Sequence, residues 1–385
     1  MGADRTVAVD DLRVVFFGTY DSHRPRFLVL NQGLRLNGID VIECHLPVWG
    51  SLEDRSQIQS AAGYVGPLAR WTIAAWRLAL AYRRLPEHDA VIVPYLGQAD
   101  VLVARILTQR QNTPLIFDPY VSLYQTVVRD RALAGSGGPV GILAKWLDKR
   151  ALGVADHVLL DTASHGLLYA NELGFNQSKG YVIPVGAEQG VFPWQPLSHR
   201  PSVDTVLFYG SMIPLHGITT IIEAASLFRN TRSIRFILVG TGQEYHKARG
   251  LSRELGADDV IEWIDAVPYA ELAKLIADAT ICLGIFGTSD KAGAVVPNKV
   301  YQCLSVGRPV ISGDTAAMRE WFTHGKNCLL VPPGDSAALA SAIRHLQGNA
   351  PLQFSLALAG HELFIEKFSS ARIGQLLSEL LTRIA

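Results

Sequence analysis

Short apolar runs alternate along this chain with longer stretches of mixed polar and apolar residues. Each run has the length of a buried strand, and each intervening stretch is long enough to form a crossover helix. This alternation predicts an α/β protein whose parallel sheets are covered by helices on both faces. In the first half the runs lie at residues 12–17, 41–45, 90–94, 115–117, 158–160 and 181–184, and in the second half they start at residue 206 and continue at residues 236–239, 261, 281–285, 310–312 and 328–331.

Prolines and serines interrupt the alternation between residues 193 and 202. The interruption predicts a linker at residues 196–202, between one domain formed by residues 1–195 and a second formed by residues 203–369. The last residues, 370–385, have the pattern of an amphipathic helix. A chain of 385 residues with 49% hydrophobic and 18% charged residues is too long for one core and has a globular composition, so two domains are expected.

The overall charge and the cysteines narrow the class of protein. Lysine plus arginine and aspartate plus glutamate are equal at 35 each, so no global field favours nucleic acid. The four cysteines lack the spacing of metal ligands and are typical of reduced core residues. The amino terminus carries charges where a signal peptide is apolar, and no apolar run reaches the roughly 18 residues of a membrane span. We therefore expect a cytoplasmic protein.

A basic stretch without acidic residues lies between residues 55 and 86. Within it, Arg70, Arg77 and Arg84 recur every seven positions near two tryptophans, and they therefore share one side of a helix. Such a helix is typical of peripheral contact with an anionic bilayer, here the inner face of the membrane. The alternative is an ordinary surface helix that buries its aromatic residues in the core.

Polar loops follow several apolar runs in the second half of the chain. The loop and short helix between the runs at residues 279–286 and 310–311 contain Lys291, Asn298 and Lys299. Open α/β sheets bind nucleotides where a loop at the carboxyl end of a strand leads into a helix, and two lysines add positive charge for a diphosphate. The alternative is a surface loop with solvated lysines.

Five segments of the chain resemble, in order, the retaining glycosyltransferases of family 4. They read IPVGAEQGVF at residues 183–192, FYGSMIPLHGITTIIEAA at 208–225, FILVGTGQEY at 236–245, PNKVYQCLSVGRPVI at 297–311 and REWFTHGKNCLLVPPGD at 319–335. The resemblance implies the GT-B fold, in which two Rossmann-like domains face each other across an interdomain cleft. It implies an acceptor on the amino-terminal domain, a nucleotide-diphosphate sugar on the carboxyl-terminal domain, and a terminal helix that crosses back to the amino-terminal domain.

Four positions depart from the family's usual charged residues. Ser211 and His216 stand where relatives have an arginine and a lysine on the diphosphate, and Ala294 and Gln302 stand where they have a pair of acids. Nucleotide binding remains the expectation, but the donor sugar is not indicated; Asp290 or Lys291 is a candidate for the missing sugar contacts. The donor-binding residues that the resemblance implies are Gly18, Gly210, Ser211, His216, Gly217, Gly240, Gly242, Lys291, Asn298, Lys299, Gln302 and Glu320.

The resemblance also implies acceptor-binding and catalytic residues at the carboxyl ends of strands. Asp118 is expected either to orient or deprotonate an acceptor hydroxyl, or only to start a turn before a proline. Glu320 has the alternative role of a first-turn acid that offsets a helix dipole. The acceptor-binding candidates are Asp21, Arg24, Tyr95 and Tyr120, and the catalytic candidates are Asp118, His165 and Lys291.

The implied reaction needs no cofactor besides the nucleotide-diphosphate sugar as co-substrate. Retaining transfer in the family is pictured as attack on the face from which the diphosphate leaves, and the leaving group accepts the proton. No D-x-D motif occurs, so the sequence does not imply a metal on the diphosphate. One alternative is a catalytically inactive GT-B scaffold, which the four departures favour. Another is an epimerase or dehydrogenase on paired Rossmann-like domains, although the chain lacks the dinucleotide-binding G-x-G-x-x-G.

Overall fold

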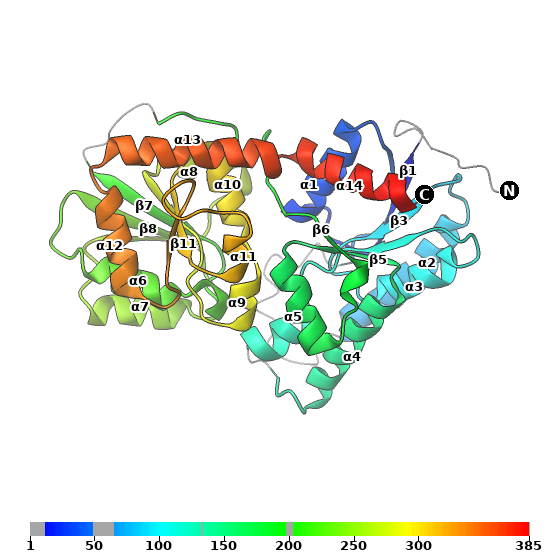
Figure 1. Ribbon diagram of the computed structural model, residues 1–385. Helices are drawn as coiled ribbons and strands as arrows, with labels where there is room; N and C mark the ends of the chain where they lie inside the picture. Colours follow the sequence, from blue (N-terminus) through cyan, green and yellow to red (C-terminus); the bar gives the residue numbers. More distant parts are fainter. Residues whose placement is uncertain (1–11, 49–64, 132–133, 198–202, 385) are drawn as a thin grey trace. The chain divides into compact units, whose positions relative to one another are not determined.

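A computed structural model describes residues 12–48, 65–131, 134–197 and 203–384 of the chain. The chain divides into two compact units (Figure 1): unit 1 comprises residues 1–185 and 370–385, and unit 2 comprises residues 186–369. The boundary therefore lies at residue 185 rather than at the predicted residue 195. The reason is that the segment after the boundary packs on unit 2, where Ser305 donates a hydrogen bond to the carbonyl of Phe192 (2.6 Å).

Unit 1 is built on a parallel sheet of six strands in the order β2-β1-β3-β4-β5-β6. Side chains alternate along a strand, so Val14 and Phe16 face one side of the sheet, whereas Val15 and Phe17 face the other. All four are fully buried, and both faces therefore need a cover of helices. The strands are β1 (Arg13–Gly18), β2 (Asp40–His45), β3 (Ala90–Val93), β4 (Leu115–Phe117), β5 (His157–Leu160) and β6 (Gly180–Val182).

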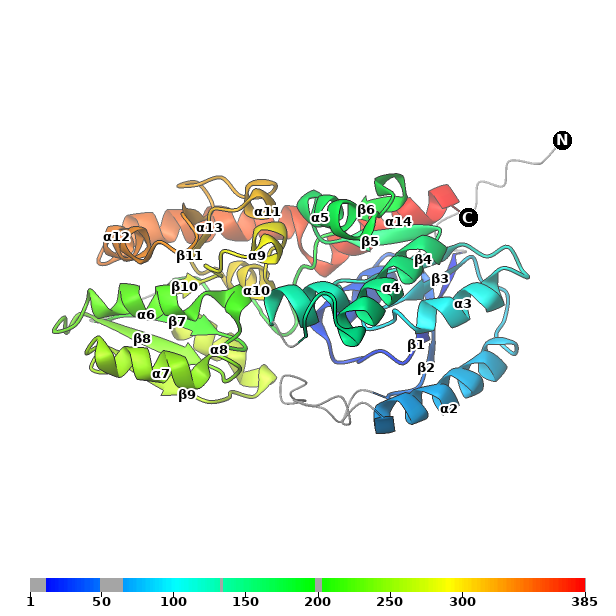
Figure 2. The ribbon, with the colours of Figure 1, turned by 90° about the horizontal axis from the view of Figure 1, so that it is seen from below.

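Helices cover both faces of this sheet (Figures 1 and 2). On one face, α1 (Pro25–Leu36) packs closely against α14 (Ser370–Ile384). The close approach is possible because Gly33 has no Cβ, which would lie 2.8 Å from the amide nitrogen of Gly374. The other face carries α2 (Val65–Tyr82), α3 (Asp100–Thr108), α4 (Pro139–Val154) and α5 (Ala163–Leu173). A π-helix, η4 (Gln125–Asp130), and a 3-10 turn, η5 (Gln177–Lys179), lie in the connections.

Unit 2 is built on a second parallel sheet, in the order β12-β11-β10-β7-β8-β9. A strand occurs at each apolar run of the second half, so the predicted α/β class with parallel sheets is confirmed. The strands are β7 (Asp204–Tyr209), β8 (Ile234–Val239), β9 (Ile261–Ile264), β10 (Ile281–Leu283), β11 (Val310–Gly313) and β12 (Leu329–Val331).

The helices of unit 2 also lie on both sides of their sheet, with α6 beside α12 and α10 beside α13 (Figure 1). They are the 3-10 turn η6 (Pro214–His216), α6 (Ile218–Ser226), α7 (Tyr245–Glu254), α8 (Tyr269–Asp278), α9 (Asp290–Ala294), α10 (Asn298–Val306), α11 (Ala316–Arg319), α12 (Ser336–Leu346) and α13 (Ala350–Lys367).

Two further expectations concern cysteines and membrane spans. All four cysteines are buried and none forms a disulfide, as expected of reduced core residues. Among the residues that the structure describes, no helix has both the length and the apolar character to cross a membrane.

Candidate active site

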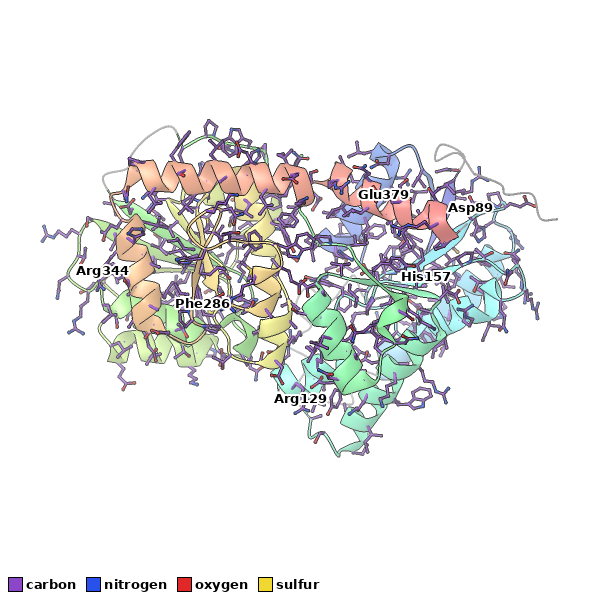
Figure 3. All side chains as sticks on the ribbon, in the orientation of Figure 1. Asp89, Arg129, His157, Phe286, Arg344 and Glu379 are labelled. Carbon is purple, nitrogen blue, oxygen red and sulfur yellow. The ribbon has the colours of Figure 1, made fainter. Side chains whose placement is uncertain are left out.

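Loops that follow β7, β8 and β10 meet at the carboxyl edge of the unit 2 sheet. A Cβ on Gly240 would lie 2.2 Å from the carbonyl oxygen of Gly210, so the first two loops are in direct contact through glycine. The third loop is equally close, because the amide of Phe286 donates to the carbonyl of His216 (3.1 Å), and a Cβ on Gly217 would lie 2.5 Å from the Phe286 backbone. Phe286 lies inside unit 2 (Figure 3). Tight packing of these loops thus explains two of the predicted glycines, Gly217 and Gly240.

Lys299 is the most unusual residue at this edge. It lies in the first turn of α10, is buried, and places its Nζ 4.0 Å from the centre of the Phe208 ring. Within the described residues Nζ has no hydrogen-bond partner. Burial lowers the pKa of Lys299 to about 7, and nearby Cys303 offsets only part of that effect. The side chain is therefore a buried amine that lacks an anion.

The neighbours of Lys299 are the residues of the β7 loop. A Cβ on Gly210 would come within 3.3 Å of the Lys299 Nζ and 3.2 Å of the His216 ring, so these predicted residues do converge. His216 is half-buried, and its Nδ1 donates to the carbonyl of Ser211, which leaves Nε2 as the nitrogen that gains a proton in the imidazolium form. Ser211 itself is exposed.

Other predicted donor residues surround this cluster. Lys291 is buried in α9, which begins where the Ser289 side chain accepts a hydrogen bond from the backbone of Ala292 (3.2 Å). Ala294 is buried, so an apolar core residue occupies the position of the family's first acid, whereas Asp290 is exposed. Asn298 is half-buried and begins α10.

Gln302 and Glu320 differ from expectation. Both ends of the Gln302 amide are engaged: Oε1 accepts from the Tyr209 hydroxyl (2.8 Å) and Nε2 donates to the Tyr269 hydroxyl (3.3 Å). Tyr269 in turn donates to Glu188 (3.0 Å), whose carboxyl pKa is raised by burial. Gln302 therefore links β7 to α8 rather than presenting an unengaged carbonyl to a ribose. Glu320 is exposed at the carboxyl end of α11, so its interpretation as a first-turn acid is wrong.

Asp118 is committed to an ion pair in unit 1. Its carboxylate faces the Nε of Arg26 at 3.0 Å, and both side chains are buried. Burial lowers the pKa of Arg26 and the facing Asp118 carboxylate raises it, with a net increase. Arg26 also donates to the carbonyls of Ile183 (2.6 Å) and Pro184 (2.7 Å). The expectation that Asp118 handles an acceptor hydroxyl is therefore not supported; this carboxylate holds the end of β6 through Arg26.

His165 forms a second buried pair in unit 1. Its Nδ1 lies 2.5 Å from Asp161 Oδ1, and its backbone amide donates to the Thr162 hydroxyl (2.9 Å) at the start of α5. Within the described residues Nε2 has no partner. The carboxylate orients the imidazole as it does in general bases, but the His165 side chain is only 1% exposed, so a substrate hydroxyl does not reach it in this conformation.

The predicted acceptor residues form two pairs at the carboxyl edge of the unit 1 sheet. Asp21 accepts from the Nε of Arg24 (3.0 Å), and the Tyr95 and Tyr120 rings meet edge to face with centroids 5.7 Å apart. Gly18 also lies in unit 1, with a φ of 135°. A Cβ there would lie 2.7 Å from Asp100 Oδ2, so this contact, rather than a phosphate, accounts for the glycine.

Sequence reasoning missed Glu188, Tyr209 and Tyr269, which hold Gln302. The available signal was Glu188, a charged residue inside the apolar segment IPVGAEQGVF. The tyrosines carry no signal of this kind, because their pairing with Gln302 appears only in the folded unit.

Comparison with known proteins identifies unit 2. Residues 203–349 match the family model described as glycosyl transferases group 1. Most of unit 2 is therefore similar to the glycosyl transferases group 1. MMP α-(1→4)-mannosyltransferase of Mycolicibacterium hassiacum is 24% identical over 191 residues, which cover 49% of this chain and 44% of that protein. The chain spans less than two-thirds of the curated relatives it matches, from 18% to 59% of their length.

Solved structures extend the similarity beyond the group 1 domain. Sucrose-phosphate synthase from Thermosynechococcus elongatus superposes with a TM-score of 0.72 at 16% identity, and covers 96% of this chain and 98% of its own. HepE of Anabaena, solved in complex with UDP and glucose, has a TM-score of 0.68 at 16% identity, and covers 96% of this chain and 99% of its own. The chain therefore has the GT-B fold, and the three glycine loops and Lys299 lie in the part that matches the group 1 model.

Proposed function

We propose that this protein is a retaining glycosyltransferase that moves a hexose-like sugar from a nucleotide-diphosphate sugar to a hydroxyl acceptor. The setting would be glycan, glycolipid or secondary-metabolite biosynthesis. The observation that carries the proposal is Lys299, a buried amine without an anion, beside the glycine loops. A buried cation is costly unless it is paired, and a diphosphate at this edge would pair it. HepE, which shares the fold, was solved in complex with UDP and glucose, and this supports a nucleotide as the ligand.

Two features besides Lys299 suit the leaving diphosphate. Helices α6 and α10 begin beside the loops, and the first amides of a helix attract anions. His216, as an imidazolium, would add a second positive charge where relatives have a lysine. These groups would stabilise the charge that develops as the sugar leaves, and the diphosphate oxygen would accept the acceptor's proton. The proposal thus assigns the chain binding and electrostatic roles, with Lys291 and Asn298 as further donor contacts.

The catalytically inactive scaffold remains the second candidate, because specific observations favour it. Ala294 is buried and apolar, and Gln302 is bound to two tyrosines, so neither supplies the usual carboxylate. A scaffold would bind nucleotide sugar at Lys299 but would not release free nucleotide from it. Release of nucleotide from the donor, with and without acceptor, distinguishes the two candidates.

Peripheral contact with an anionic bilayer is a further part of the proposal, and its support comes from the exposed face of α2. Arg70 and Arg77 of α2 are exposed, as is Arg84, which follows the helix and so does not share its face as predicted. Trp76 is 66% exposed rather than buried in the core. Trp146 of α4, a helix of the same layer, is 49% exposed. Basic and apolar side chains on one helical layer are suited to anionic lipid. Sedimentation with phosphatidylglycerol vesicles tests this: the double change Trp76→Ala, Trp146→Ala should release the protein, whereas Leu36→Ala, at an exposed position on α1, should not.

The donor proposal is tested by a thermal-shift screen of the whole chain with UDP, GDP, CDP, ADP and dTDP. We expect one nucleotide to raise the melting temperature, because only the folded state binds it. Lys299→Ala should abolish that increase, whereas Lys274→Ala, which removes an exposed lysine of α8, should leave it unchanged. If no nucleotide raises the melting temperature at millimolar concentration, or if Lys299→Ala leaves the increase intact, the proposed donor site is wrong.

A further inference from the structure

Unit 1 contains a cavity of about 810 Å³ at the carboxyl edge of its sheet. Its walls are the loop between β1 and α1, the residues that follow β2, and the middle of α2 from Arg70 to Arg77. A volume of this size is typical of sites for small ligands, and the carboxyl edge is where open parallel sheets bind them. Of the predicted acceptor residues, Asp21 is one that lines the cavity.

Asp100 holds two walls of this cavity together. Its Oδ2 accepts from the backbone amide (2.7 Å) and the hydroxyl (2.9 Å) of Thr19 in the β1 loop, and its Oδ1 accepts from the Trp71 indole (2.7 Å) of α2. Asp100 is buried, and hydrogen bonds to a carboxylate are strong away from water. These bonds therefore fix α2 against the loop. Trp71 is therefore an anchor, and the residue before it, Arg70, is placed at the cavity wall.

The charged side chains of this lining are mainly cationic. Arg70 and Arg77 are two helical turns apart on α2 and both line it. Neither has a hydrogen bond or ion pair with any residue in the described part of the chain. His23 and His45 contribute two ring nitrogens each, and one of these, His45 Nε2, is bound to the carbonyl of Tyr20 (2.7 Å).

Asp21, the acid among the described lining residues, already has basic partners. Asp21 lines the wall, but its Oδ2 accepts from Arg24 Nε at 3.0 Å, and its Oδ1 lies 3.6 Å from the His23 ring. The two unpaired guanidinium groups therefore set the local charge. A guanidinium presents a planar pair of N–H donors that can bind two oxygens of one phosphate group. A single carbonyl or hydroxyl oxygen cannot use both donors in this way.

We propose that this cavity binds a phosphate group carried by the acceptor substrate. The inference rests on the proposed transferase function and names the chemical class of its acceptor: a phosphate or diphosphate ester with a hydroxyl to be glycosylated. The volume leaves room for more than the phosphate, and Ile73 and Val48 supply apolar wall beside the arginines. The ester has two possible sources, a water-soluble phosphorylated sugar or alcohol and a lipid phosphate, and both share the group that the arginines would bind.

The test measures binding of four probes to the whole chain by calorimetry: glycerol phosphate, glycerol, geranyl phosphate and geraniol. We expect at least one phosphate ester to bind about tenfold or more tightly than its alcohol. The double change Arg70→Gln, Arg77→Gln should remove that preference, and Arg70→Lys, Arg77→Lys should retain part of it. Arg83→Gln is the matched control, because Arg83 is an exposed arginine that follows α2 and does not line the cavity.

The probes distinguish the two sources of the phosphate. Equal binding of both esters would support the cavity and point to a soluble acceptor, whereas selective binding of geranyl phosphate would support it and point to a lipid. Equal binding of ester and alcohol would overturn the inference. An equal loss of affinity for the phosphate esters in Arg83→Gln and in the double variant would overturn it as well. Nucleotide binding measured on the same samples reports on unit 2, so a failed donor site and a failed acceptor cavity give different results.

Discussion

A buried ion pair in unit 1 and a buried amine in unit 2 show two ways in which this chain treats buried charge. In unit 1, Arg26 and Asp118 pair with each other, and Asp148 accepts from the Ser122 hydroxyl (2.7 Å). In unit 2, Lys299 is buried with an aromatic ring beneath its amine and no hydrogen-bond partner among the described residues. A paired buried charge holds elements together, whereas an unpaired one costs stability until a ligand arrives. The presence or absence of a partner thus distinguishes buried charges that stabilise the fold from those that are available to bind a ligand.

The largest effect is expected when the pairing in unit 1 is broken. Arg26→Met would leave the Asp118 carboxylate buried without its partner and should lower the free energy of unfolding by about 3–5 kcal/mol. Urea denaturation measures the loss. Arg24→Met, which removes the exposed partner of Asp21, should cost less than about 1 kcal/mol. Adding Asp118→Leu to Arg26→Met should recover part of the loss; if it recovers nothing, the ion pair is not what holds this region.

In unit 2, removal of a buried charge is expected to increase the free energy of unfolding. Lys299→Met removes an unpaired buried amine and keeps the apolar stem, so it should raise the free energy of unfolding of the ligand-free protein by about 1–3 kcal/mol. The same variant should lose nucleotide binding. Denaturation and nucleotide titration of one preparation measure both. A variant that is less stable than the natural protein would mean that Lys299 already has a stabilising partner.

The pH dependence of this difference follows from the lowered pKa of Lys299. Folding lowers that pKa from 10.5 to about 7, because burial disfavours the charged form. Below pH 7 both folded and unfolded chains bind the proton and the cost of burial is fully present. Between about 7 and 10.5 the unfolded chain binds more protons, so stability rises with pH. The advantage of Lys299→Met should therefore be largest at pH 6 and smaller at pH 9; a constant advantage would argue against a lowered pKa.

A smaller effect is expected at the polar link around Gln302. Tyr269→Phe removes the hydroxyl that joins Gln302 Nε2 to Glu188, and should lower the free energy of unfolding by about 1–2 kcal/mol. Tyr245→Phe, which removes a hydroxyl bonded to Asp265 in an exposed position, is the control and should cost less. If both variants lose the same free energy of unfolding, the buried link contributes no more to stability than an exposed hydrogen bond does.

The sequence predicted the fold well because burial on both sheet faces demands apolar runs, and each run became a strand. It also predicted that the glycine loops and Lys299 follow strands of the second sheet, because the order of strand, loop and helix is a local feature of the sequence. It did not predict that Asp118 pairs with a residue 92 positions away, or that Gln302 bonds to Tyr209 across 93 positions. Those partners meet only when the units fold. The boundary at residue 185 was missed because the segment that follows packs by contacts with residues far along the chain.

The central claim is that Lys299 awaits the diphosphate of a nucleotide. Calorimetric titration of the nucleotide at pH 8, in buffers of different ionisation heats, tests it directly because it counts protons taken up on binding. The claim predicts an uptake that approaches a whole proton in the natural protein, since a facing diphosphate raises a pKa that starts near 7, and a much smaller uptake with any residual binding by Lys299→Met. Binding without proton uptake, or equal uptake by both proteins, would contradict it.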